Sequence, residues 1–212
     1  MCSHFENHRD RAHLSTLFNL TPVSTTDNVD VWPGYDAHFI TQAEGTNFLY
    51  TGSFGLMPNW AKNQKIQSKT YNARTETVAQ KPSFKLAWQQ RQHCIIPAQA
   101  IYEPKYEAAR ALPTRIYDRY GAPLLIAGLW NTWRNGEGHA INSFTMLTIG
   151  AAAHSLMKQF HHPDDEKRMV VMLNVEQAKQ WLGGERFSDY PVMPANNLDY
   201  DVEDDSAQLA LF

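Results

Sequence analysis

The sequence predicts an α+β fold, a single domain in which a curved, largely antiparallel β-sheet forms a barrel-like core flanked by a few helices. Many short runs rich in β-branched and aromatic residues are separated by turn signals, which is typical of antiparallel sheets. Only a few stretches carry apolar residues at helical spacing. The 212 residues are 43% hydrophobic and 19% charged, an ordinary globular composition.

Three elements are expected in the first half of the chain. Apolar residues share one face of a short helix over 7–19, and a strand follows over 48–56. After a polar, basic loop over 59–70, a threonine-capped helix is predicted over 75–91, although Pro82 lies inside it.

The second half predicts most of the sheet and two further helices. One helix covers 151–160, and another covers 175–182 and is closed by Gly183-Gly184. The expected strands span 94–96, 99–103, 113–118, 124–130, 143–149 and 169–173.

No linker precedes about residue 195, so we expect one domain over 2–198 and a tail over 199–212. Residues 199–205 hold five acidic side chains and no basic one, and such a run is usually solvated. The formal net charge of -3 does not suggest a nucleic-acid binder. Residues 58–115, however, hold ten Lys and Arg against three acidic residues, which predicts a local basic face.

Several classes of protein are not expected. The longest apolar run, 122–130, is far short of the roughly 20 residues of a membrane-spanning helix, and the first residues lack an apolar signal-peptide core. Two cysteines make no disulfide framework, so a reducing cytoplasm is expected. Nucleotide-binding loops and zinc motifs are missing from the sequence, so we expect no cofactor and no metal.

Cys2 offers unusual chemistry if the initiator Met1 is removed. A terminal cysteine carries an α-amine with a pKa of about 7.7–8.0 and a thiol with a pKa of about 8.5. This aminothiol suits aldehydes, since the amine forms a Schiff base and the thiol then closes a thiazolidine. The alternative is that the cysteine stands at position 2 by chance.

Three other segments carry candidate functional residues. Asn72 offers a donor and an acceptor, and Arg74 offers a planar fork suited to phosphate, with Glu76 as a capping or orienting carboxylate. The alternative is ordinary helix-start chemistry. Glu103 closes an apolar run, where partial desolvation would raise its pKa into the range that suits proton transfer. The alternative is that Glu103 faces water on an edge strand.

The run His161-His162-Pro163-Asp164-Asp165-Glu166 follows the predicted helix over 151–160. A histidine at a helix C-terminus has its cationic form favoured, which makes His161 a candidate general acid. His161 is preferred to His162 because it directly follows the helix and Phe160. Adjacent histidines rarely bind one ion, so a metal site is not expected here.

Five boxes in register carry a family resemblance: the N-terminal Met-Cys, YNARTET, CIIPAQAIYEP, AGLW and AAAHSLMKQFHHPDDEKRMVVML. In this order and spacing the chain resembles, over about residues 2–195, the SOS response-associated peptidase (SRAP) family of abasic-site processing proteins. The resemblance implies an SRAP-type domain that binds single-stranded DNA and crosslinks to abasic sites.

The resemblance also implies roles for individual residues. Cys2 would be the nucleophile, Asn72 would position the sugar or the cysteine, and Glu103 and His161 would move protons. Arg74 would hold a phosphate, and the activity would be a lyase-like Schiff-base reaction, with self-removal of Met1 as a peptidase activity. Two aromatic residues that could stack on bases, Trp60 and Trp32, and two basic residues, Lys62 and Lys65, are further candidate DNA-binding residues.

The chain departs from the family pattern in three places. It begins MCSHF in place of MCGRF, which puts His4 where a basic residue is usual. Ala61 follows Trp60 where a second Trp is frequent, and Tyr-Glu-Pro replaces Phe-Glu-Trp around Glu103. These departures concern DNA affinity and stacking, and leave the nucleophile unchanged.

The last five residues are similar to the QLxLF motif by which bacterial proteins bind the replicative sliding clamp. An extended terminal segment could place apolar side chains in a pocket, with the glutamine fixing register. The residues concerned are Gln208, Leu209, Leu211 and Phe212. The alternative is that this segment packs on its own domain.

The expected partners are therefore single-stranded DNA with abasic sites and the sliding clamp. The protein is expected to be a monomer in the cytoplasm of a bacterium, associated with the nucleoid. Two other functions stay open. One is a cysteine peptidase that uses Cys94 and a histidine, and the other is a noncovalent single-strand binder tethered to the clamp.

Overall fold

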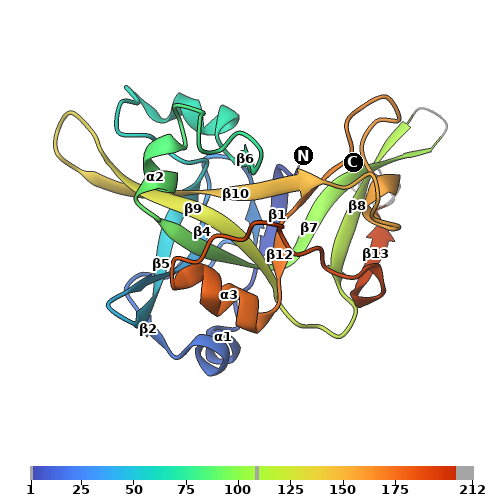
Figure 1. The fold of residues 1–212 in the computed structure, drawn as a ribbon, viewed down its shortest axis with the longest axis horizontal. Helices are drawn as coiled ribbons and strands as arrows, with labels where there is room; N and C mark the ends of the chain where they lie inside the picture. The colour runs from blue at the N-terminus through green and yellow to red at the C-terminus, as the bar shows by residue number, and fades with distance from the viewer. Residues whose placement is uncertain (1, 108–109, 204–212) are drawn as a thin grey trace, which may run out of the picture.

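The computed structural model describes residues 2–107 and 110–203 and has a closed β-barrel at its centre (Figure 1). Consecutive pairing around the ring joins β4 to β5, β5 to β10, β10 to β9, β9 to β7 and β7 back to β4. These strands are β4 (Asp36–Ala43), β5 (Thr46–Phe54), β7 (His93–Glu107), β9 (Leu124–Arg134) and β10 (Ala140–Gly150). Only the β5–β10 pair of the ring is parallel, so the predicted barrel-like, largely antiparallel core is confirmed.

Shorter strands extend this ring. β1 pairs with β7 and β3, and β8 forms a hairpin with β7 and carries β13 on its other edge. β6 and β11 pair with β10, β12 pairs with β9, and β2 pairs with β5. Their bounds are β1 (His4–Asn7), β2 (Leu20–Pro22), β3 (Asp30–Val31), β6 (Asn72–Arg74), β8 (Arg110–Asp118), β11 (Arg168–Val170), β12 (Met172–Leu173) and β13 (Leu198–Val202).

Within the described residues three α-helices flank the sheet: α1 (Arg11–Phe18), α2 (Lys85–Gln89) and α3 (Val175–Leu182). In Figure 1, α1 and α3 lie below the barrel and α2 lies above its left-hand end. Short 3-10 helices occur at Gln64–Lys69, Met157–Gln159 and Ala195–Asn197. Asn174 and Gln177 form a capping box at the start of α3, which confirms the predicted helix over 175–182. The helix predicted over 7–19 is present as the shorter α1, because residue 7 belongs to β1.

Alternation along β7 divides the core into two layers. Ile95 belongs to the layer that packs under α3, whereas its neighbour Ile96 belongs to the layer that includes the contacting rings of Phe39, Phe54 and Phe144. Between β7 and β10, Gly128 of β9 has no room for a side chain, since an added Cβ would lie 2.4 Å from the Thr145 carbonyl oxygen. The barrel wall is therefore packed on both faces.

Two predicted helices are wrong. Residues 75–84 form turns, because Thr75 donates its backbone N–H to the Thr148 carbonyl beside β10 and helix α2 begins only at Lys85, after Pro82. Residues 151–160 hold turns and one 3-10 turn over Met157–Gln159. The predicted strands 94–96 and 99–103 are parts of the single strand β7.

The acidic run does not begin as a free tail. Residues 199–202 belong to β13, which pairs with β8 across the predicted boundary at residue 198. Asp201 lies opposite Arg115 in this strand pair, and the Asp199 carboxylate lies 3.4 Å from the Nε of Arg119, the residue that follows β8. The segment Gln208–Phe212 lies outside the described residues.

No helix in the described parts of the chain is long and apolar enough to cross a membrane. Within those same ranges both cysteines are buried free thiols, and no group of three or more His, Cys, Asp or Glu side chains is arranged to hold a metal ion.

Candidate active site around Cys2

Cys2 lies just before β1 and is held against the inside of the sheet. It is 1% exposed, and its thiol donates to the His4 carbonyl oxygen at 3.3 Å. Strand β6 reaches it from the other side, where the Asn72 Nδ2 donates to the Cys2 carbonyl oxygen at 2.6 Å. Burial and the nearby Glu103 charge both raise the pKa of the Cys2 thiol, so the thiol is protonated in this state.

Glu103 stands on β7 opposite Thr114 of β8 and is 2% exposed. Burial raises the pKa of Glu103 to about 7, in the direction expected from its apolar surroundings. Near neutral pH the carboxyl group therefore exists in both protonation states, which suits it to give and take a proton.

His161 completes the cluster. Its Nδ1 lies 3.4 Å from the Glu103 Oε2, and its Nε2 lies 2.9 Å from the Arg168 carbonyl oxygen. Because a carbonyl oxygen only accepts, the Nε2 carries the hydrogen and the Nδ1 of the neutral ring faces Glu103. His162 lies on the surface beside Asp164, at 3.7 Å, and takes no part in the cluster.

The expected cationic state of His161 is wrong. The residue follows an extended Phe160 and adopts a left-handed backbone with φ of 65°, so no helix C-terminus stabilises its charge. Burial instead lowers the pKa of His161, which keeps the imidazole neutral at pH 7. The ring is thus a proton acceptor toward Glu103 in the resting site.

Lys167 holds the loop that carries His161. Its Nζ donates to three successive carbonyl oxygens, those of Phe160 at 3.0 Å, His161 at 3.1 Å and His162 at 2.7 Å. The His161 backbone N–H donates to the Pro104 carbonyl of β7 at 2.7 Å. The sequence analysis missed Lys167, because three converging carbonyls arise from loop conformation and leave no signal in residue spacing.

An arginine network borders the site. Arg74 pairs with Glu166 at 2.7 Å, and Glu166 also pairs with the buried Arg168 at 2.6 Å. Glu76 does not orient Arg74 as expected, since it pairs with Arg168 at 2.9 Å. Neither Arg168 nor Glu166 was singled out from the sequence, although both belong to the segment that was.

Aromatic rings form a wall beside Cys2. His4 lies opposite Tyr102 in the β1–β7 pair, and its ring is stacked between Tyr102 and Trp32, with both centroid distances at 4.1 Å. Trp32 is 45% exposed and therefore presents part of its ring to solvent. The wall lines a pocket of about 180 Å³ together with other residues; the full lining is Ser3, His4, Trp32, Tyr102, Glu103, Pro104, Ala111 and Pro113.

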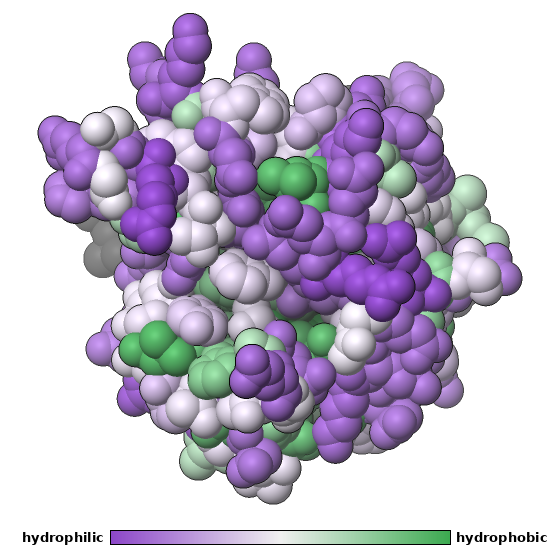
Figure 2. Space-filling model, turned by 60° about the vertical axis from the view of Figure 1, so that its left-hand side comes forward, coloured by the Kyte–Doolittle hydropathy of each residue, from purple (hydrophilic) through white to green (hydrophobic). Residues whose placement is uncertain are grey.

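Trp60, Lys62 and Lys65 lie elsewhere. The two lysines line a separate hollow of about 420 Å³ against Trp133 and Ile141 of the β9–β10 hairpin. Trp60 is exposed, and its Nε1 donates to the Pro82 carbonyl oxygen at 3.4 Å. Figure 2, turned toward this end of the molecule, shows a mostly hydrophilic face with separate apolar patches.

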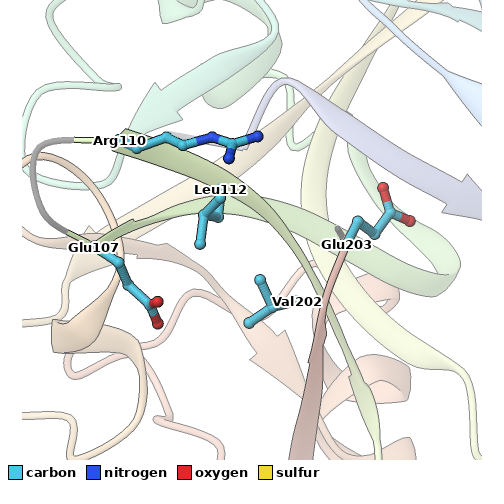
Figure 3. A pocket seen from close by; sticks show the side chains of 5 residues that line it. All are labelled: Glu107, Arg110, Leu112, Val202 and Glu203. Atoms are coloured by element: carbon cyan, nitrogen blue, oxygen red, sulfur yellow. The ribbon is translucent and has the colours of Figure 1, made fainter. Parts of the chain in front are cut away.

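A further hollow of about 450 Å³ lies at the far end of the β7–β8 hairpin, beside the end of β13 (Figure 3). Its lining is Glu107, Arg110, Leu112, Val202 and Glu203. None of these residues belongs to the Cys2 cluster, so this hollow is not the candidate active site.

The fold and the cluster together define a class: a barrel-like α+β protein with a cysteine near its N-terminus, set against an amide, a carboxyl and an imidazole. Its family follows from sequence comparison. The chain belongs to the SOS response associated peptidase (SRAP) family, whose profile matches residues 1–199.

Relatives of this chain share one description. Abasic site processing protein YoaM of Bacillus subtilis is 35% identical over 177 residues, which cover 82% of this chain and 74% of the relative. Abasic site processing protein YobE of the same organism is 36% identical over 176 residues, with 82% and 76% covered. Abasic site processing protein HMCES of Xenopus tropicalis is 27% identical, with 78% of this chain and 53% of the relative covered.

Solved structures agree with the fold. A protein from Bordetella bronchiseptica superposes with a TM-score of 0.86 at 38% identity, covering 96% of this chain and 100% of that chain. A protein from Bacteroides thetaiotaomicron superposes with a TM-score of 0.79 at 19% identity, covering 98% and 94%. The second likeness concerns the fold alone.

Proposed function

We propose that this protein captures abasic sites in single-stranded DNA as a covalent adduct of Cys2 after loss of Met1. The observation that carries the proposal is the meeting of Cys2, Asn72, Glu103 and His161 from four separate segments. The description of the relatives as abasic site processing proteins supports the same substrate.

The reaction uses both groups of the terminal cysteine. The α-amine adds to the ring-opened deoxyribose aldehyde to give a carbinolamine, which loses water to become an imine. The thiol sulfur then bonds to the imine carbon while its proton passes to the nitrogen, closing a thiazolidine. The adduct therefore equals protein plus DNA minus one water.

Glu103 and His161 supply the proton transfers. A protonated Glu103 donates to the departing hydroxyl of the carbinolamine, which its pKa of about 7 allows at neutral pH. Neutral His161 accepts a proton from the amine or the thiol. Asn72 fixes the Cys2 backbone so that amine and thiol face the same carbon.

The DNA strand is held by charge and stacking. Arg74 binds a phosphate close to the lesion, and Trp32 stacks a flanking base at the mouth of the 180 Å³ pocket. Trp60, Lys62 and Lys65 contact the strand farther away, along the β9–β10 hairpin.

Intact-mass spectrometry with an abasic oligonucleotide tests the proposal. The parent protein should give a Met-less adduct that lacks one water, and Cys2→Ala should give none. Cys94→Ser is the matched control, since it removes the other buried thiol, and it should crosslink like the parent. Equal crosslinking by Cys2→Ala and the parent would end the proposal.

The same pair of variants tests the rival peptidase. That function needs a reactive Cys94; burial raises the pKa of Cys94 as it raises that of Cys2, so the acidity of the thiols does not separate the two functions and the variants do. Loss of peptidase activity in Cys94→Ser but not in Cys2→Ala would favour it. Self-removal of Met1 is a separate activity. Mass spectrometry of the Glu103→Gln variant shows whether Met1 is still removed from its N-terminus.

The noncovalent rival predicts complexes with DNA that high salt reverses completely. A covalent thiazolidine survives both salt and denaturant, so denaturing electrophoresis separates the two functions.

We further propose that Gln208, Leu209, Leu211 and Phe212 bind the replicative sliding clamp and raise the local concentration of the protein at forks. Deletion of residues 208–212 should abolish clamp binding and leave crosslinking of free oligonucleotides unchanged. Clamp binding that survives the deletion would contradict this part of the proposal.

A further inference from the structure

One carboxylate joins two arginines at the edge of the site. The Glu166 Oε2 lies 2.7 Å from the Arg74 Nη1, and the Glu166 Oε1 lies 2.6 Å from the Arg168 Nη1. The two arginines differ in burial, since the side chain of Arg74 is 46% exposed and that of Arg168 is 2% exposed. The ion pair of Glu166 with Arg74 should therefore break more readily than its ion pair with Arg168.

Arg74 lies next to the reactive residue. It stands two positions after Asn72 on β6, and alternate residues of a strand share one face. Asn72 binds the Cys2 carbonyl oxygen, and the pairing of Arg74 with Thr148 of β10 fixes the strand. An anion bound by Arg74 would therefore lie on the Cys2 side of β6.

We propose that Glu166 acts as a phosphate surrogate, which occupies Arg74 in the free protein and is displaced by a phosphodiester of the single strand when DNA binds. The inference rests on the proposed function, and it deepens it by naming a residue that lowers DNA affinity. Carboxylate and phosphate oxygens present the same kind of acceptor to a guanidinium fork, so they compete for Arg74.

Glu166 can release Arg74 without disturbing the fold. Its other oxygen stays on Arg168, which also holds Glu76 through two contacts of 2.9 and 3.1 Å and the Thr148 carbonyl at 2.9 Å. The hydrogen bond from Arg168 lowers the pKa of Glu166, so the carboxylate stays ionised and competes at neutral pH. The ion pair that breaks, between Arg74 and Glu166, is exposed to solvent, and solvent-exposed ion pairs contribute little free energy.

Fluorescence anisotropy with an undamaged single-stranded oligonucleotide tests the inference in low salt. Glu166→Gln should bind between about 1.5-fold and fivefold more tightly than its matched control, which reflects the worth of an exposed ion pair. The control is Asp164→Asn, which changes the net charge equally at a solvent-exposed acid of the same loop. Thermal unfolding confirms that each variant is folded, and the pair Glu166→Ala and Asp164→Ala, which again changes the net charge equally, replaces the first pair if needed.

A double-mutant cycle with Arg74→Gln gives the decisive comparison. Without Arg74, Glu166→Gln should tighten binding no more than Asp164→Asn does. An equal gain with and without Arg74, or no difference between Glu166→Gln and Asp164→Asn, would overturn the surrogate. A parent protein that neither binds nor crosslinks single-stranded DNA would instead refute the proposed function.

Discussion

The Asn72 side chain donates a 2.6 Å hydrogen bond to the Cys2 carbonyl oxygen, which joins residues 70 positions apart in the chain. The bond ties the short strand β6 to the segment that enters β1, and so holds the backbone of Cys2 in place.

Asn72→Ala should slow crosslinking about tenfold, because losing a partly buried hydrogen bond costs roughly 1–2 kcal/mol and frees the Cys2 backbone. Single-turnover rates at saturating abasic DNA measure the effect. Asn47→Ala is the control, since Asn47 also donates to a backbone carbonyl, that of Phe18 at 2.7 Å, and its removal should leave the rate unchanged. Equal slowing in both variants would indicate a general loss of stability.

Glu103 should make the free energy of unfolding depend on pH. Its folded pKa of about 7 lies above the ordinary glutamate value of 4.5, so the unfolded chain releases the proton first as pH rises. The folded state of the parent should therefore lose stability relative to Glu103→Gln between about pH 4.5 and 7, by on the order of 3 kcal/mol at most. Urea unfolding of both proteins at several pH values gives this difference, and a flat difference would contradict the raised pKa.

Lys167→Met should misplace His161, because three carbonyls of its loop lose their common donor. We expect stability to fall by about 1–2 kcal/mol and the crosslinking rate to fall more than DNA affinity does. Lys158→Met, which removes an exposed lysine from the preceding turn, is the control, and Lys167→Arg should restore part of the rate. If affinity falls as much as the rate, Lys167 acts on DNA and not on His161.

Trp32→Ala should weaken binding of undamaged single-stranded DNA by about five- to 100-fold, the worth of one stacked base. Trp32→Phe should retain part of the affinity. Tyr120→Ala removes an aromatic ring that is more exposed but lies outside the 180 Å³ pocket, and it should have no effect in the same anisotropy assay. Loss of affinity in Tyr120→Ala alone would place the stacking surface elsewhere.

The local sequence pattern was sufficient to predict a helix or strand where that element is stabilised by its own residues. Helix α3 was predictable from its apolar face and from Gly183-Gly184, and β9 and β10 from runs of β-branched and aromatic residues. The helix expected over 75–91 begins only at Lys85, because Thr75 donates its backbone N–H to the Thr148 carbonyl of β10 and Pro82 precedes α2. The start of the acidic run likewise became strand β13, because β8 offers its free edge for antiparallel pairing and Arg119 pairs with Asp199.

The sequence by itself determined the fold class, the family resemblance and the residue types of the candidate site, because all three depend on composition, alternation and motif order. Only the tertiary structure decided how Cys2, Asn72, Glu103 and His161 face one another and that His161 is neutral. It also revealed Lys167 and Glu166, because their partners lie on loops and distant strands, and such contacts depend on backbone geometry that residue spacing does not encode.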